Sequence, residues 1–140
     1  MNQSKLGDTG ESIFSVMTAY AHEHKAINLA QGFPGFEPDS RLFECTRKAM
    51  DSGENQYAPM TGVPALNAYL CEMLNNSYQA QLSPGTHLTI TAGATQGIFT
   101  AITAMVHAGQ EVIVFDPAYD CYKPAIQLAG GKVRALPLDQ

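Results

Sequence analysis

Apolar residues recur at helical spacing in four long stretches of the sequence. The first three stretches are residues 11–24, 41–52 and 64–76. The fourth begins after Gly93, and Ile98, Ile102 and Met105 in it lie on one helical face. We therefore predict four amphipathic helices, the last of which runs to Gly109, because glycine is common just beyond a helix end.

Residues suited to helix ends support this interpretation. Asp39 or Ser40 can accept a hydrogen bond from the first turn of the second helix, and Gly53 can end that helix. Pro64 fits the first turn of the third helix, where its missing N–H group costs nothing.

Three short apolar runs predict strands. They are residues 88–92, 111–115 and 132–138, and a short helix between the last two ends at Gly130. The run at 111–115 is apolar on both faces, as expected of a parallel strand covered on each side. The order strand, helix, strand, helix, strand predicts right-handed crossover units, and so an α/β fold with a mainly parallel sheet and helices on both faces.

The junction after the first predicted strand has the features of an anion-binding corner. Gly93 can adopt backbone conformations that other residues avoid, and it lets a ligand approach the main chain. The following helix has no acid in its first turn, and Thr95 adds a hydroxyl donor. Unpaired N–H groups at such a helix start favour a phosphate group. An ordinary turn, in which Thr95 only caps the helix, explains the same residues equally well.

Composition narrows the class of protein. Of 140 residues, 45% are hydrophobic and 15% are charged, which is the balance of a globular domain. The net charge of −5, without basic runs, argues against a nucleic acid or an anionic membrane as partner. No apolar run is long enough to span a membrane, and the N-terminus lacks the apolar core of a signal peptide. A cytoplasmic protein is expected.

No metal site is expected from the His and Cys positions. His22 and His24 are two positions apart, so they do not share a helical face. Cys45, Cys71 and Cys121 share no metal-ligand spacing and are expected to be reduced thiols.

Two classes of cofactor suit the carboxyl end of the predicted sheet, where α/β proteins bind ligands. A dinucleotide is one, because Asp116 follows Gly93 by 23 residues at the end of the next strand and could contact a ribose. The turn reads G-A-T-Q-G, however, and lacks the middle glycine of the dinucleotide motif. The other class has a single phosphate, held at Gly93 to Thr95, and an aromatic ring on which Tyr119 stacks.

Four motifs, taken together, resemble one family. They are NLAQGFPGFEPD, NQYAPMTGVPALNAYL, ITAGATQGIFTAI and VFDPAYDCYKPAI. In this order and spacing they resemble the N-terminal part of pyridoxal-phosphate-dependent aminotransferases of class I/II, fold type I, in the methionine and kynurenine aminotransferase branch. The resemblance implies a three-layer α/β/α large domain preceded by an N-terminal helix and loop arm. The chain would then be roughly the first third of a family member.

The resemblance also implies roles for the residues at the corner. Gly93, Ala94 and Thr95 would hold the phosphate of pyridoxal 5'-phosphate, and Tyr119 would stack on its pyridine ring. Tyr57 would reach the phosphate across the interface of a homodimer. The sequence alone, without the resemblance, favours a tyrosine at the edge of the core at position 57.

Three residues are implied on the substrate side. Gly32 and Phe33 would line the substrate pocket near the carboxylate of the amino acid, and Phe14 would line the pocket for its side chain. By its Gly and Pro content alone, the loop that contains Gly32 could also be a rigid surface connector.

The family needs further groups that do not stand out here. A lysine must form a Schiff base with the cofactor and move the α-proton, and an arginine must bind the substrate carboxylate. No lysine or arginine of this sequence has the expected setting, so the resemblance places all catalytic residues beyond Gln140. We expect the 140 residues to be inactive alone.

The predicted function is transamination between a methionine-, aromatic- or kynurenine-like amino acid and a 2-oxo acid, by a full-length homodimer. The alternatives are β-elimination on the same scaffold, a dinucleotide-binding domain, and a non-catalytic fragment that binds a partner half. The expected organisation is an N-terminal helix and substrate-side loop over residues 1–38, followed by the first part of the cofactor-binding domain over residues 39–140, truncated after its third strand.

Overall fold

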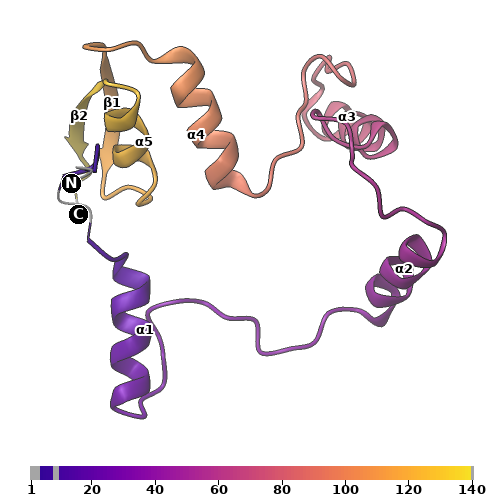
Figure 1. Ribbon diagram of the computed structural model, residues 1–140, viewed down its shortest axis with the longest axis horizontal. Coiled ribbons are helices and arrows are strands. Elements are labelled where there is room, and N and C mark those ends of the chain that lie inside the picture. Colours follow the sequence, from indigo (N-terminus) through magenta and orange to yellow (C-terminus); the bar gives the residue numbers. More distant parts are fainter. Residues whose placement is uncertain (1–3, 8–9, 140) are drawn as a thin grey trace. The chain divides into compact units, whose positions relative to one another are not determined.

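The computed structural model describes residues 4–7 and 10–139. It is an α/β structure (Figure 1). The elements are α1 (Ile13–Glu23), α2 (Ser40–Asp51), α3 (Pro64–Tyr78), α4 (Ala94–Met105), β1 (Glu111–Asp116), α5 (Tyr122–Leu128) and β2 (Lys132–Pro137). The five predicted helices and the last two predicted strands are confirmed.

The chain forms two compact units. The first comprises Met1–Gly32 and Ala92–Gln140, and so contains α1, α4, α5 and both strands. The second comprises Phe33–Thr91 and contains α2 and α3. The division of the chain at residue 38 into an arm and a cofactor-binding domain stays a prediction.

The two strands of the first unit are parallel neighbours, as the sequence predicts. Glu111 lies opposite Lys132 at one end of the pair, and Asp116 lies opposite Pro137 at the other. Parallel neighbours need a long crossover connection, and α5 supplies it. The carboxyl end of β1 therefore lies beside the start of the segment that leads into α5.

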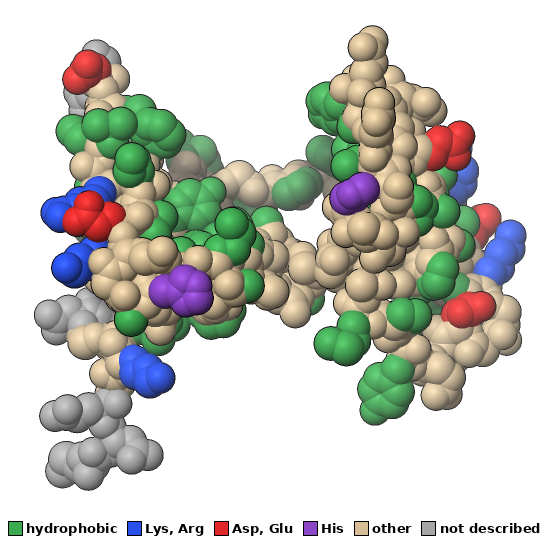
Figure 2. All heavy atoms as spheres, turned by 90° about the horizontal axis from the view of Figure 1, so that it is seen from above, with side chains coloured by type: hydrophobic (Ala, Val, Ile, Leu, Met, Phe, Trp, Pro, Cys, Tyr) green, Lys and Arg blue, Asp and Glu red, His purple; other side chains and the backbone are tan. Residues whose placement is uncertain are grey.

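The core of the first unit lies between α5 and one face of the sheet. Val114 of β1 is buried, and so are Ala125 and Ile126 of α5. On the opposite face of β1, the side chains of Ile113 and Phe115 are 72% and 58% exposed. Figure 2 shows many hydrophobic side chains at the surface of the chain. The sequence predicts helices on both faces of the sheet. Within the described residues, a helix packs on only one face.

Capping explains where the helices of the second unit begin. The Asp39 carboxylate accepts a hydrogen bond from the Arg41 N–H at 2.9 Å, which makes Asp39 the residue that caps α2. Pro64 is in the first turn of α3, as predicted. On α3, Asn67 and Cys71 are buried.

The predicted strand at residues 88–92 is wrong, because no strand is formed there in the described chain. The Ile90 N–H instead donates to the Thr61 carbonyl at 3.0 Å. An extended apolar segment becomes a strand only when a neighbouring backbone offers a ladder of hydrogen bonds. Its side-chain pattern does not say whether that neighbour is present.

The predicted end of the fourth helix is also wrong. The helix stops at Met105, because Val106 has the extended backbone angles φ −95° and ψ 120°. Gly109 serves the turn into β1, where its N–H donates to the Gly130 carbonyl at 2.8 Å. None of the helices in the part of the chain described is long and apolar enough to cross a membrane.

Candidate functional site

The start of α4 forms an open backbone corner in the first unit. Gly93 precedes the helix with φ 83° and ψ 165°, a conformation that is essentially restricted to glycine. A side-chain carbon built at Gly93 would meet no atom within 4 Å. The space above the backbone is therefore open, and a ligand can approach the main chain there.

The donor groups of this corner suit an anion. The first turn of α4 contains no acidic residue, and no side chain of the described chain caps it. Ala94 and Thr95 are exposed. The side chain of Gln96 turns back, and its Oε1 accepts the Ala92 N–H. Because the first N–H groups of a helix have no intrahelical partner and lie at the positive end of its dipole, they attract negative charge.

Tyr119 lies in the turn between β1 and α5 and is 49% exposed. Its ring makes an edge-to-face contact with Tyr122, with 6.0 Å between the ring centroids and an angle of 70° between the planes. The Tyr122 N–H also donates to the Tyr119 carbonyl at 3.2 Å. The ring of Tyr119 is therefore oriented by its neighbour while part of its surface stays accessible.

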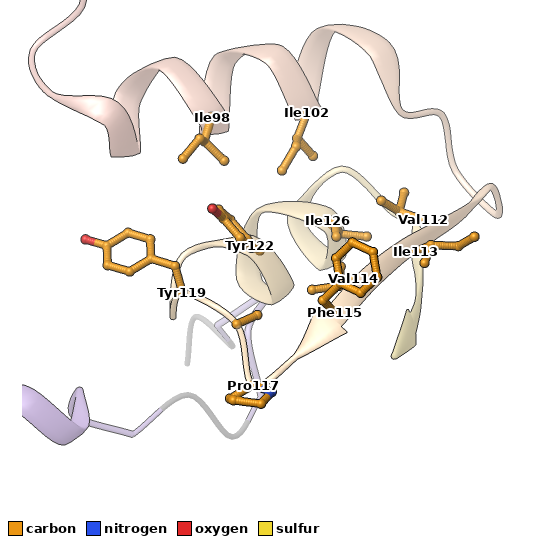
Figure 3. A pocket seen from close by; sticks show the side chains of 11 residues that line it. Ile98, Ile102, Val112, Ile113, Val114, Phe115, Pro117, Tyr119, Tyr122 and Ile126 are labelled. Atoms are coloured by element: carbon orange, nitrogen blue, oxygen red, sulfur yellow. The ribbon is translucent and has the colours of Figure 1, made fainter. Parts of the chain in front are cut away.

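A hollow of about 590 Å³ connects these elements within the first unit. Figure 3 shows Ile98 and Ile102 of α4 pointing toward side chains of β1 and α5, with the ring of Tyr119 beyond Ile98, on the side where α4 begins. Tyr122 lines the same hollow. Its walls are mostly apolar, and its phenol rings suit an aromatic ligand.

Asp116 ends β1 beside this hollow and is paired with a lysine. Lys123 Nζ lies 3.1 Å from Asp116 Oδ1. The dinucleotide alternative required the Asp116 carboxylate for a ribose contact, and here that carboxylate neutralises Lys123. The pair ties the end of β1 to the first turn of α5, on either side of Tyr119.

The structure brings only some of the predicted site residues into one unit. Gly93, Ala94, Thr95 and Tyr119 belong to the first unit with the hollow. Gly32 and Phe14 belong to the same unit. Gly32 is exposed, and Phe14 is half-buried on α1.

The remaining two predicted site residues belong to the second unit. Phe33 is 67% exposed, and the side chain of Tyr57 is fully exposed. The Tyr57 ring does not pack against a core formed by the described residues. Its assignment to the cofactor phosphate stays a prediction.

Sequence reasoning missed Tyr122 and the partner of Lys123. Tyr122 follows Tyr119 by three positions, a spacing that brings side chains together in a helical turn. That spacing was the available signal for the aromatic pair. The ion pair between Lys123 and Asp116 had no comparable signal, because it depends on how the chain turns after β1.

Comparison with known proteins shows which family this chain resembles. Residues 24–140 match the family described as aminotransferase class I and II. The methionine aminotransferase of Escherichia coli strain K12 is 48% identical over 136 residues, which are 97% of this chain and 35% of that protein. The human kynurenine–oxoglutarate transaminase 1 is 36% identical over 115 residues, 80% of this chain and 27% of that protein.

A solved structure agrees with these relatives. The protein YbdL of Escherichia coli, whose crystal structure and reactivity identified a methionine aminotransferase function, matches with a TM-score of 0.93 and 47% identity. The match covers 99% of this chain and 36% of that chain. The chain thus spans about a third of the length of its relatives, and its fold is that of the fold type I pyridoxal-phosphate-dependent enzymes. The predicted resemblance is confirmed, and the chain belongs to the class I and II aminotransferases.

Proposed function

We propose that the protein containing this chain transfers an amino group from a methionine-, aromatic- or kynurenine-like amino acid to a 2-oxo acid with pyridoxal 5'-phosphate. Membership in a family of pyridoxal-phosphate-dependent enzymes supports the cofactor. The observation that carries the proposal is the acid-free start of α4 in the same unit as Tyr119, whose ring lines a hollow together with Ile98 of α4. Methionine and kynurenine relatives support the substrate class.

The residues at the corner fit the cofactor's phosphate. Gly93 leaves its backbone accessible, since a side-chain carbon there would meet nothing within 4 Å. Ala94 and Thr95 would offer N–H groups, and Thr95 a hydroxyl, to a dianion at the positive end of α4. The absence of an acid from the first turn of α4 avoids repulsion with that charge.

The aromatic ring of the cofactor has a matching partner. Tyr119 would cover one face of the pyridine ring, while Tyr122 holds the phenol ring of Tyr119 edge-on at 6.0 Å. The apolar hollow would exclude water from that face. When bound, the cofactor supplies an aldehyde that takes up the amino group and an electron-poor ring that stabilises negative charge at the reacting carbon.

The other assigned residues would act on the phosphate and on the substrate. The exposed hydroxyl of Tyr57 would donate to the cofactor phosphate of a second copy in a homodimer. Gly32 and Phe33 would lie near the substrate carboxylate, and Phe14 would contact the substrate side chain. The cytoplasmic location of this homodimer stays a prediction.

The lysine that bonds to the cofactor would lie outside these 140 residues. Among the lysines of the chain, Lys123 is held by Asp116 and so contributes to the turn at Tyr119. We therefore expect the 140 residues alone to lack activity. A protein of about 15 kDa in its natural source would instead favour the alternative of a fragment that binds a partner half.

Titration of the complete protein with pyridoxal 5'-phosphate tests the proposal. We expect a new visible absorbance band, and transfer of the amino group from methionine or kynurenine to a 2-oxo acid in the same preparation. Thr95→Ala should weaken cofactor binding. Thr103→Ala is the matched control, because the Thr103 hydroxyl bonds carbonyls of the same helix, Phe99 among them at 2.8 Å.

Two results would contradict this function. One is a folded complete protein that gives no visible band with the cofactor. The other is equal loss of cofactor affinity in the two threonine variants, which would mean that the start of α4 has no special part in binding. Release of pyruvate from a cysteine conjugate, measured in the same assay, would identify β-elimination as the reaction.

A further inference from the structure

The side chain of Asn67 makes a buried contact in the second unit that the proposed function has not used. Asn67 is 2% exposed on α3. Its Nδ2 donates to the Thr61 carbonyl at 2.8 Å, and the same carbonyl accepts the Ile90 N–H at 3.0 Å. A carbonyl oxygen has two lone pairs, so these two donors satisfy it fully.

The other half of the Asn67 amide indicates that this contact does more than stabilise the fold. Asn67 Oδ1 is buried and has no hydrogen-bond partner among the described residues. A buried acceptor without a donor lowers stability, and an apolar side chain of similar size would avoid that loss. Asparagine is therefore useful at this position because its Nδ2 holds the Thr61 carbonyl.

The Thr61 carbonyl belongs to a tight turn close to Tyr57. The Gly62 N–H donates to the Pro59 carbonyl at 2.8 Å and closes the turn. Gly62 has φ 104°, and a side-chain carbon there would lie 2.4 Å from Ile90 Cγ1. The turn thus packs directly against Ile90 and tolerates only glycine at that point.

The loop that carries Tyr57 is anchored at both ends. At its start, Asn55 Nδ2 donates to the Met50 carbonyl at the end of α2, at 2.9 Å. At its finish stands the Asn67 contact with Thr61. Only residues 56–60 lie between the two anchors. Because this segment is so short, the two anchors set the direction in which the exposed Tyr57 ring points.

We propose that Asn67 is a positioning residue that holds the Thr61 carbonyl and thereby orients the Tyr57 loop for contact with the cofactor phosphate. The inference rests on the proposed function for the identity of the phosphate. The part of the inference that concerns the loop is independent of the proposed function, because Asn67 also holds the loop in the cofactor-free protein.

Asn67→Leu in the complete protein separates positioning from stability. The variant loses the donor but also the unpaired acceptor, so its urea unfolding midpoint should match or exceed that of the unmodified protein. Its dissociation constant for pyridoxal 5'-phosphate should rise by about three- to tenfold. Amide hydrogen exchange at residues 57–62 should be faster without cofactor. Asn67→Ala is the second variant if Asn67→Leu does not fold; it should show the same loss of affinity and the same faster exchange, with a lower unfolding midpoint because of the space it leaves.

A double variant and a matched control make the test specific. Tyr57→Phe removes the hydroxyl, and adding Asn67→Leu to it should raise the dissociation constant no further, because both changes act through the same contact. Asn75 is the control, since on the same helix it holds the Leu82 backbone with two hydrogen bonds of 2.8 and 3.0 Å. Asn75→Ala should lower stability and leave cofactor affinity unchanged.

The proposal is overturned if folded Asn67→Leu binds cofactor normally and exchanges normally, or if its effect multiplies independently with that of Tyr57→Phe. Equal loss of affinity in Asn75→Ala would also overturn it. An unmodified protein that binds no cofactor would refute the proposed function instead. In that case the exchange rates alone decide whether Asn67 holds the loop.

Discussion

Lys123 Nζ lies 3.1 Å from Asp116 Oδ1 and joins the end of β1 to the first turn of α5. Both side chains are nearly half exposed, at 44% and 45%. Water and salt therefore weaken their attraction. The pair neutralises a carboxylate at the carboxyl end of the sheet and encloses the turn in which Tyr119 lies.

Replacing Lys123 by methionine should have a small effect on stability. We expect the free energy of unfolding to fall by at most about 1 kcal/mol, because a half-exposed ion pair contributes little. Urea unfolding of the complete protein measures this, and the difference should shrink in high salt. Lys132→Met is the control, since no ion pair of Lys132 is found in the described chain. A loss that is independent of salt would show that the Lys123 stem acts through packing.

Tyr119 should act through its ring. Tyr119→Phe keeps the aromatic face and should bind pyridoxal 5'-phosphate almost as well as the unmodified protein. Tyr119→Ala loses stacking, and the dissociation constant should rise by about 2- to 12-fold, the equivalent of one aromatic contact. Absorbance or fluorescence titration provides both constants. If Phe and Ala are equally poor, the hydroxyl and not the ring is the functional group.

Gly93→Ala should test the backbone of the corner. Alanine meets no steric obstacle there, but the φ of 83° costs a side-chain-bearing residue about 1–3 kcal/mol. We expect a lower melting temperature and weaker cofactor binding, since relief of the strain moves the first N–H groups of α4. Gly53→Ala is the matched control, with φ 88° and no neighbouring atom within 4 Å. It should lower the melting temperature alone, and equal weakening of cofactor binding in both variants would contradict the role of the corner.

The ion pair of Glu111 with Arg134 should make the stability of the folded chain depend on pH. The hydrogen bond from the Arg134 guanidinium across the two strands, together with its positive charge, lowers the pKa of the Glu111 carboxyl. A group whose pKa is lower in the folded state stabilises that state above its unfolded pKa, which for glutamate is about 4.3. This stabilisation is lost as the pH falls through the lower folded-state value.

Thermal unfolding of the unmodified protein and of Glu111→Gln, followed from pH 7 to pH 3, measures this effect. We expect the two melting temperatures to differ at pH 7 and to converge in acid, once Glu111 is protonated. A difference that stays constant over the whole range would mean that the pair acts through shape and not charge.

Local patterns were sufficient for much of the fold. Helical spacing of apolar residues predicted the first four helices, the place between two strands predicted α5, and Asp39 and Pro64 marked two of the helix starts correctly. Gly93 was predicted at the start of α4 because a strained turn and an acid-free first turn are both properties of neighbouring residues. The motifs also identified the family, which the matches confirm.

Local patterns could not predict contacts between residues that are distant in the sequence. The segment at 88–92 has the composition of a strand, yet Ile90 bonds to Thr61 and no ladder forms. Gly109 does not end α4, which stops at Met105, and its N–H instead donates to the Gly130 carbonyl in the turn into β1. In the sequence, nothing distinguishes Asn67 from other helical asparagines. Its burial and its hydrogen bond to the Thr61 carbonyl are found only in the structure.

By itself, the order of residues determined where helices begin, which faces are apolar and which family the chain joins. Helix starts and apolar faces are short-range properties, set by neighbours within one or two turns, and the family follows from the order and spacing of four such local motifs. Only the tertiary structure decided that the Thr61 carbonyl takes two donors and that Lys123 neutralises Asp116. Such pairings depend on where separate segments meet, and that is decided by packing and hydrogen-bond satisfaction over the whole unit, not by sequence spacing.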